Sequence, residues 1–220
     1  MKSKVLFFVL GAALLFGAST LKAQDEVKDY DGNSYKTVKI GSQVWMAENL
    51  KTTHYRDGAE IPNVTDRSKW AAATTPGYCW YDNDKGNKDE YGALYNWYVV
   101  GTGKLCPKGW HVPTDAEWKT LESKLGGAEE AAAKLKEKGD THWKKADENA
   151  TDEYGFAAVG AGFRNSDGDF TYKLSDACWW TATPGTLKYA CNRVFSYYSQ
   201  GISRRDIQKT NGYSVRCVKD

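Results

Sequence analysis

The sequence lacks the local motifs of several common enzyme and membrane-protein classes. Beyond the first 23 of its 220 residues, no apolar run reaches the roughly 20 residues that a membrane-spanning helix needs. Neither G-x-x-x-x-G-K-[ST] nor G-x-G-x-x-G occurs, and H-E-x-x-H and G-x-S-x-G are also absent. With only three histidines, no local arrangement suggests a Ser-His-Asp or Cys-His catalytic site. These absences exclude a helical membrane protein and leave no motif that points to an enzyme.

An excess of charge of one sign is also missing. The chain has 30 Lys and Arg residues against 28 Asp and Glu residues. The first 23 residues contain three of the lysines and no acid, so the remainder has 27 basic and 28 acidic residues. Because nucleic-acid binding relies on basic surface, we expect no nucleic-acid partner.

Residues 1–23 have the features of a secretory signal peptide. Lys2 and Lys4 precede an apolar stretch over residues 5–18, and Ala23 ends a small-residue cleavage site. The apolar stretch is too short for a membrane anchor, and no cysteine follows it as a lipoprotein would require. We expect cleavage after Ala23, no integral membrane segment thereafter, and a secreted, periplasmic or cell-surface location.

Five cysteines follow the predicted signal peptide: Cys79, Cys106, Cys178, Cys191 and Cys217. Export allows disulfides to persist, and an odd number leaves at least one cysteine outside an intramolecular bridge. Spacing alone leaves several pairings open, although Cys178 and Cys191 flank a Pro-Gly turn and suit a bridge across a hairpin. Because the sequence has no C-x-x-C and no histidine close to a cysteine pair, we predict no metal cofactor there.

Hydrophobic periodicity predicts helices in the middle of the chain. Thr114 and Glu117 form a capping box that predicts a helix over residues 115–125. A weaker pattern follows over residues 128–137, and helical spacing predicts a further helix over residues 91–100.

Strands are predicted at both ends. Alternation and turn residues indicate a hairpin with strands over residues 34–40 and 43–46. Short aromatic and β-branched runs predict later strands over residues 156–159, 170–172, 178–183, 190–198 and 213–218. We therefore predict an α+β domain over residues 24–220.

An acidic, turn-rich segment near residue 84 is the one candidate for a metal site. Asp82 and Asp84 offer the hard oxygen ligands that calcium prefers. The EF-hand pattern fails because Asn87 occupies its glycine position. A solvated acidic loop is the favoured interpretation.

A group of aromatic and arginine residues in the loop-rich segment from about 160 to 211 is the candidate ligand-binding surface. Its members are Trp179, Trp180, Tyr189, Arg193, Tyr197, Tyr198, Arg204 and Arg205. Aromatic side chains with a polar edge suit sugar rings and peptide side chains, and arginines can orient a ligand. The alternative is that these residues pack in the core, as we expect for Trp45, Trp97, Trp110 and Trp118. Exposure to solvent distinguishes the two interpretations.

Five motifs in chain order resemble a known family. They are DYDGNSYKTVKIG (29–41), QVWMAENL (43–50), YGALYNWY (91–98), LCPKGWHVPTDAEW (105–118) and SVRCV (214–218). Together they resemble the Fibrobacter succinogenes major paralogous domain over about residues 27–220. That family is grouped with C-type-lectin-like folds, and its Pro-Thr-x-x-Glu-Trp segment is similar to that of the formylglycine-generating, sulfatase-modifying enzymes.

The resemblance implies an exported bacterial protein with a C-type-lectin-like fold: a small twisted antiparallel sheet, two main helices and long loops. It also implies that Cys106 bridges Cys217, which leaves Cys178 to pair with Cys191 and Cys79 free. No reaction carries over from the family. In the formylglycine-generating enzymes reactive cysteines bind copper, but the segment around Cys178 and Cys191 does not match their catalytic segment.

These observations favour a non-catalytic binding or adhesion module that recognises a glycan or a protein on the cell exterior and needs no cofactor. An oxidase related to the formylglycine-generating enzymes is the alternative, and it predicts free, reactive thiols at Cys178 and Cys191. A third hypothesis is a structural component of a surface assembly in which Cys79 joins two chains.

Overall fold

The first sheet is built around the hairpin that the sequence predicts. In the computed structural model, which describes residues 25–220, β2 (Ser34–Ile40) and β3 (Gln43–Met46) pair antiparallel at the expected residues. Gly41 forms the turn with φ +62°, which glycine adopts without steric cost. Three further strands complete the sheet, in the order β1-β2-β3-β12-β6: β1 (Glu26–Lys28), β6 (Trp110–His111) and β12 (Val218–Lys219). The predicted signal peptide, residues 1–23, lies outside the described residues.

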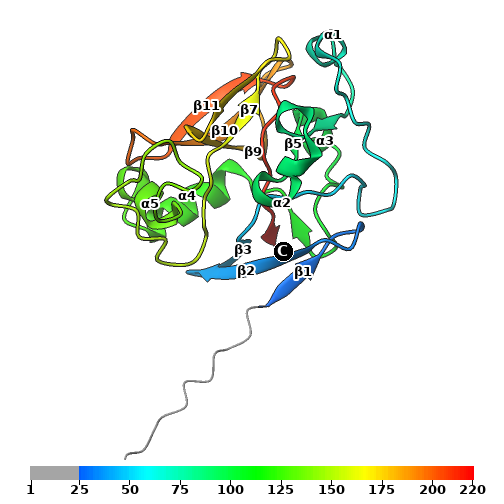
Figure 1. Cartoon of the computed structure of the whole chain (residues 1–220). Helices are drawn as coiled ribbons and strands as arrows, with labels where there is room; N and C mark the ends of the chain where they lie inside the picture. Colours follow the sequence, from blue (N-terminus) through cyan, green and yellow to red (C-terminus); the bar gives the residue numbers. More distant parts are fainter. Residues whose placement is uncertain (1–24) are drawn as a thin grey trace, which may run out of the picture.

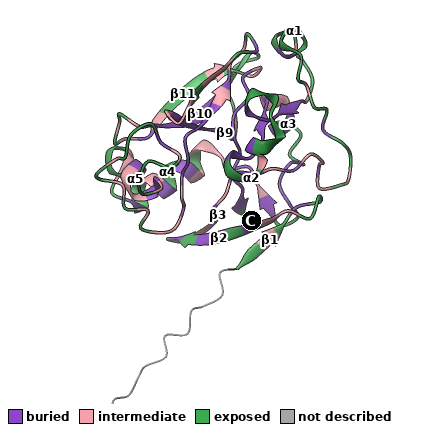
Figure 2. Ribbon diagram, in the orientation of Figure 1, coloured by how far each residue is buried: buried purple, intermediate pink, exposed green. Residues whose placement is uncertain are grey.

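The second sheet also has five strands and comes from the C-terminal part of the chain. Its order is β11-β10-β9-β7-β8. The strands are β7 (Ala161–Arg164), β8 (Phe170–Lys173), β9 (Asp176–Pro184), β10 (Tyr189–Ser196) and β11 (Ser203–Gln208). All neighbouring pairs are antiparallel except β7 and β9, which pair in parallel. β11 forms an exposed edge, whereas most of β9 and β10 is buried (Figure 2).

The two longest helices follow the predicted capping box. α4 (Asp115–Lys124) begins at Thr114, whose hydroxyl accepts the Glu117 amide while the Glu117 carboxylate accepts the Thr114 amide, as the sequence predicts. α5 (Ala128–Leu135) follows at once. The chain between β3 and β6 of the first sheet holds short elements: α1 (Arg67–Ala71), β4 (Tyr78–Cys79), η1 (Tyr81–Asn83), η2 (Lys85–Asn87), α2 (Lys88–Tyr91), β5 (Leu94–Tyr95) and α3 (Trp97–Val100).

Helix α4 connects the cores of the two sheets. Figure 1 shows the first sheet at the bottom of the view, the second at the top, and α4 with α5 between them at the left. Trp118 of α4 lies 4.9 Å from Trp45 of β3 and 5.9 Å from Trp179 of β9, measured between ring centroids. A second cluster, which includes Trp180, Tyr95 and Tyr213, fills the other face of the second sheet. Both faces of β9 are therefore covered by aromatic side chains.

The predicted mixture of helices and strands is confirmed in this coarse form, with several corrections. Two five-stranded sheets and a two-stranded sheet of β4 and β5 replace the single small sheet that was expected. Residues 91–100 form β5 and α3 instead of one helix. Asn96 adopts an extended conformation and caps α3, so the helix begins only after it. Residues 156–159 form no regular strand, and residues 213–218 make isolated bridges before β12. None of the helices found in residues 25–220 has the length and apolarity to cross a membrane.

Candidate ligand-binding site

The two adjacent tryptophans of the predicted surface lie in the core. Trp179 and Trp180 are both 0% exposed. The Trp179 indole N–H donates to Asn49 Oδ1 at 2.9 Å, and that of Trp180 donates to the Tyr95 carbonyl at 2.7 Å. Their assignment to a ligand surface is therefore wrong. Neighbours in a strand point to opposite faces, and here both faces are covered.

Arg193 is also wrongly assigned, because it faces α4 and is only 1% exposed. Its Nη2 atom lies 2.7 Å from Asp115 Oδ1. Its Nε atom lies 2.9 Å from Glu122 Oε1, in an ion pair without hydrogen-bond geometry. Burial with two carboxylate partners makes Arg193 a structural cation that holds α4 against β10.

Arg204 and Tyr189 are exposed but do not lie beside Tyr198, and Arg204 instead shares Asp115 with Arg193 on the α4 face. Arg204 of β11 pairs with Asp115 at 3.3 Å and with Asp206 at 3.2 Å. Tyr189 begins β10, whereas Tyr198 follows its end at Ser196. Those ends are about 23 Å apart at the rise of an extended strand. A single small site cannot include both tyrosines.

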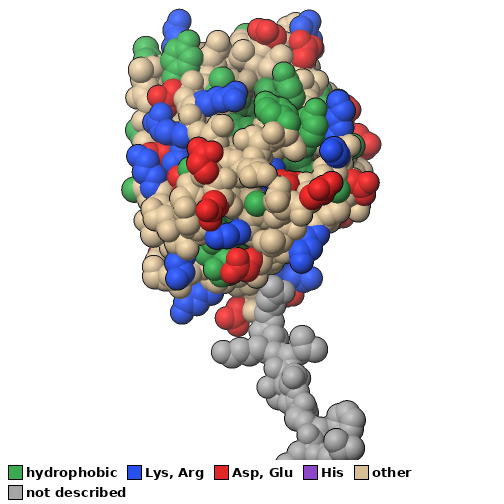
Figure 3. Space-filling view, turned by 90° about the vertical axis from the view of Figure 1, so that its left-hand side faces the viewer, with side chains coloured by type: hydrophobic (Ala, Val, Ile, Leu, Met, Phe, Trp, Pro, Cys, Tyr) green, Lys and Arg blue, Asp and Glu red, His purple; other side chains and the backbone are tan. Residues whose placement is uncertain are grey.

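Tyr197, Tyr198 and Arg205 remain, at and beside the turn between β10 and β11. The side of the molecule that faces left in Figure 1 gathers hydrophobic side chains in one part of its surface, bordered by charged side chains (Figure 3). Tyr198 is 69% exposed, and its ring contacts that of Tyr197 edge-on at 5.3 Å. Arg205 projects from the adjacent strand β11 and is exposed.

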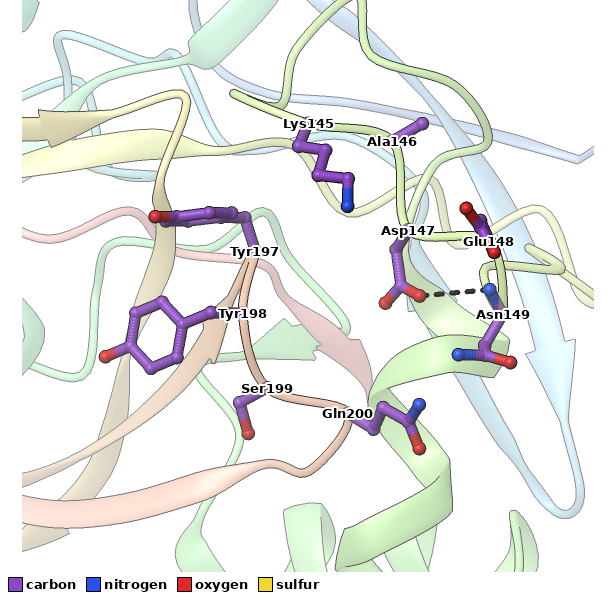
Figure 4. A pocket seen from close by; sticks show the side chains of 9 residues that line it. All are labelled: Lys145, Ala146, Asp147, Glu148, Asn149, Tyr197, Tyr198, Ser199 and Gln200. Carbon is purple, nitrogen blue, oxygen red and sulfur yellow. Dashed lines mark hydrogen bonds between the residues drawn. The ribbon is translucent and has the colours of Figure 1, made fainter.

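A polar hollow of about 260 Å³ lies on one side of Tyr198. Figure 4 shows Tyr197 and Tyr198 on one side of it and Asp147 with Asn149 on the other. Beneath it, the Lys136 ammonium donates to Asp147, and to the Ser196 and Ser199 carbonyls at 2.8 and 2.7 Å. Burial alone would raise the pKa of Asp147, but the hydrogen bond from Lys136 lowers it. Lys136 thereby fixes the turn that carries Tyr198.

A groove of about 190 Å³ opens on the other side of Tyr198. We call it the Tyr198 groove; it is lined by Phe163, Tyr172, Asp176, Cys178, Asn192, Val194, Tyr198 and Arg205. Tyr172 is 53% exposed, and its ring stacks on Phe163 at 5.5 Å with 6° between the planes. Two exposed tyrosines therefore border the groove, one from β8 and one from the β10–β11 turn.

The polar groups of the groove come from three neighbouring strands. Asp176 of β9 is 8% exposed and accepts the Ser196 hydroxyl at 2.7 Å. Burial raises the pKa of Asp176, opposed by that hydrogen bond and by the charge of Arg205. Arg205 lies directly opposite Asn192 in the register of β10 and β11. Asn192 is 1% exposed, and within residues 25–220 its Oδ1 atom has no hydrogen-bond partner.

The comparison with protein families bears on the whole of this architecture. The family model described as the Fibrobacter succinogenes major domain matches residues 38–219, which include all of the second sheet, α4 and every residue of the Tyr198 groove. The chain belongs to this family. No curated protein and no solved structure matches the chain.

Of the two disulfides that the Fibrobacter succinogenes major domain resemblance implied, one is confirmed. Cys106 and Cys217 are bridged, with an S–S distance of 2.02 Å. The pairing of Cys178 with Cys191 is wrong, because their side chains point to opposite faces of the second sheet. Cys178 lines the groove, while Cys191 Sγ donates to Asp115 Oδ1 at 3.2 Å on the α4 face. Cys79 is buried and unbridged, as expected.

The weak calcium candidates of this Fibrobacter succinogenes major domain have local structural roles. Asp84 accepts the Gly86 amide at 2.8 Å and caps η2, while Asp82 adopts φ +53° inside η1. Over the described range 25–220, no three His, Cys, Asp or Glu side chains gather in an arrangement that could hold a metal ion.

Sequence reasoning found Tyr198 and Arg205 but missed the rest of the groove. Asn192 and Val194 alternate with Arg193 in β10, so the strand pattern places them on the face opposite α4. Tyr172 and Asp176 reach the same place only through the pairing order of β7, β8 and β9. That order cannot be derived from local patterns.

Proposed function

We propose that this Fibrobacter succinogenes major domain is an exported, non-catalytic module that binds a glycan in the Tyr198 groove. The observation that carries the proposal is the combination, around one small groove, of two exposed tyrosines with Arg205, Asp176 and an Asn192 amide oxygen that has no partner within residues 25–220. Tyrosine rings provide flat apolar surfaces with a polar edge, which suit the faces of sugar rings. The polar groups supply donors and acceptors for sugar hydroxyls.

The size of the groove favours a glycan over a protein ligand. Its volume of about 190 Å³ lies below the range of about 300 to 1,000 Å³ for drug-sized ligands, and suits a single ring. A stable protein partner commonly buries about 800 Å² on each side. Other exposed large hydrophobic residues, such as Leu187 and Tyr30, lie outside the groove. The exposed features of the groove that could bind a ligand are therefore confined to a small, polar area, which suits a sugar better than a protein surface.

We also propose that the fold is C-type-lectin-like and that the protein acts outside the cytoplasm. The two main helices beside the sheets, the long connections and the Cys106–Cys217 bridge support these proposals. A disulfide is typical of proteins in oxidising compartments.

The oxidase alternative receives limited support from the cysteines. Cys178 and Cys191 are both unbridged, as that hypothesis requires. However, they face opposite sides of the sheet, and burial raises the pKa of Cys178 well above its usual range and that of Cys191 to about 11. Protonated thiols on opposite faces do not form a reactive pair. Burial also raises the pKa of Cys79 to about 12, which disfavours a bridge between chains.

The test is calorimetric titration of the purified protein with a panel of neutral oligosaccharides. We expect Tyr198→Ala and Arg205→Ala each to weaken binding about tenfold or more, because each removes a contact worth about 1.4 kcal/mol. Tyr189→Ala and Arg204→Ala are the matched controls, since these exposed residues lie outside the groove. Equal losses in the controls, or no binding of any oligosaccharide, would contradict the proposal.

A further inference from the structure

The chemistry of the groove floor narrows the class of sugar. We infer that the groove takes an N-acetylated sugar residue and that its acetamido group is held against Asn192. This inference rests on the proposed glycan-binding function. It follows from three features of the groove: a buried amide oxygen without a partner in the described part of the chain, apolar neighbours beside it, and charges of both signs in the same lining.

The first feature is the side chain of Asn192. It lies in the middle of β10, is 99% buried, and belongs to the groove lining. Nearly all buried polar atoms in proteins have a hydrogen-bond partner, yet Asn192 Oδ1 has none among residues 25–220. A ligand that brings an N–H or O–H donor to this atom satisfies it. Both an acetamido group and a hydroxyl meet that first requirement.

The second feature distinguishes these two groups. Val194 lies two residues along the same face of β10, and Cys178 is its direct partner on β9. Val194 and Cys178 are 6% and 1% exposed and both line the groove. An acetamido group carries a methyl beside its N–H, so it contacts this apolar floor while it donates to Asn192. A hydroxyl can donate to Asn192 but has no methyl group to contact Val194 and Cys178.

The third feature excludes a strongly charged substituent. Arg205 lies opposite Asn192 in the register and can donate to the acetamido oxygen. The carboxyl of Asp176 lines the same groove and would repel the carboxylate of an acidic sugar when ionised. Charges of both signs within one small groove therefore fit a neutral, polar substituent better than an anion.

The experiment compares two probes that differ at one substituent. β-1,4-linked N-acetylglucosamine tetramer and β-1,4-linked glucose tetramer share their length and linkage and differ at carbon 2. Calorimetric titration of the purified protein should give at least tenfold tighter binding of the N-acetylated probe. Saturation-transfer NMR of that complex should give its strongest signal at the acetyl methyl group.

Two variants test the named contacts. Asn192→Ala should weaken binding of both probes, and it should reduce the preference between them to less than about threefold because the acetamido group is no longer held over the apolar floor. If that variant fails to fold, Val194→Leu provides the second test, since it fills the floor without removing a polar group and should reduce the preference likewise. Arg204→Ala, on the α4 face of the neighbouring strand and outside the groove, is the control and should retain the full preference.

The outcomes separate the inference from the proposed function. Equal affinity for the two probes, with Tyr198→Ala weakening both, overturns the inference and leaves the glycan-binding function standing. A preference for the N-acetylated probe that survives both Asn192→Ala and Val194→Leu also overturns it. Binding of neither probe, together with no binding of other neutral oligosaccharides, overturns the proposed function itself.

Discussion

Asn192 and Arg193 are adjacent in β10 and equally buried, but they differ in what surrounds their polar atoms. Each is 1% exposed. Arg193 faces α4, where Asp115 and Glu122 both pair with it. Asn192 faces the groove, and within the described chain its Oδ1 atom has no partner. On the α4 face of the second sheet, the buried polar group of β10 thus has partners within the protein. On the opposite face, at the Tyr198 groove, a buried polar atom lacks one among residues 25–220.

The comparison separates structural from functional polar residues. A buried polar group that is satisfied internally specifies the fold, whereas a buried polar group without a partner costs stability unless a ligand supplies one. Substitutions on the α4 face should therefore change stability. Substitutions in the groove should change binding and leave stability nearly unaltered.

The largest stability effect is expected for Arg193→Ala on the α4 face. This change removes the buried cation that Asp115 and Glu122 share, leaves both carboxylates partly buried, and should destabilise the protein by about 3 to 5 kcal/mol. Denaturant unfolding measures the loss. Arg204→Ala, one strand away and exposed, should cost less than about 1 kcal/mol. Similar losses for the two arginines would show that burial between Asp115 and Glu122 adds nothing to the contribution of Arg193.

An intermediate effect is expected from the titration of Asp115. Burial would raise its pKa, but hydrogen bonds with Lys119 and Cys191 and the charge of Arg193 lower it to about 2. Because the folded-state pKa lies below its ordinary value of 3.8, the stabilisation is complete above about pH 4 and is lost as the pH falls towards 2. The loss amounts to about 2 kcal/mol.

Acid unfolding of the wild type and of Asp115→Asn checks this prediction. The wild type should lose more stability between pH 4 and 2 than the variant, because the variant has no carboxyl at this position to titrate. Parallel pH profiles would show that Arg193 and its neighbours do not act on Asp115 as described.

The smallest stability effect is expected for Asp176→Asn in the groove. Burial raises the pKa of Asp176, so its ionised form is disfavoured in the folded state and its cost appears as the pH rises. Asparagine retains an acceptor for the Ser196 hydroxyl and carries no charge. Stability at pH 7 should be unchanged or rise by up to about 1 kcal/mol, while oligosaccharide affinity falls. A clear loss of stability would assign Asp176 to the structural group instead.

The sequence predicted correctly those elements that depend on interactions between residues close together in the chain. The β2–β3 hairpin follows from strict alternation with a glycine turn, and α4 follows from a capping box that needs only Thr114 and Glu117. Residues 91–100 were mispredicted because apolar residues at helical spacing also suit a short strand that pairs with β4. Strands β7 and β11 were missed because their pairing partners, more than their own sequences, define them.

The candidate site was predicted only in part, because the burial of its residues also depends on elements that are distant in the chain. Composition alone identified Tyr198 and Arg205, but it also selected Trp179, Trp180 and Arg193. Their burial depends on α4 covering one face of the sheet and on residues around Tyr95 and Tyr213 covering the other. The position of Asn192 next to Arg205 depends on strand register, which no local pattern determines.

The most direct test of the account is an NMR titration of isotopically labelled protein with the neutral oligosaccharide that binds most tightly. The glycan-binding hypothesis predicts saturable shifts concentrated at the backbone amides of Tyr172, Asn192, Val194, Tyr198 and Arg205, with Tyr189 at the far end of β10 unaffected. Shifts concentrated at the far end of β10, or no saturable shift with any oligosaccharide, would contradict it.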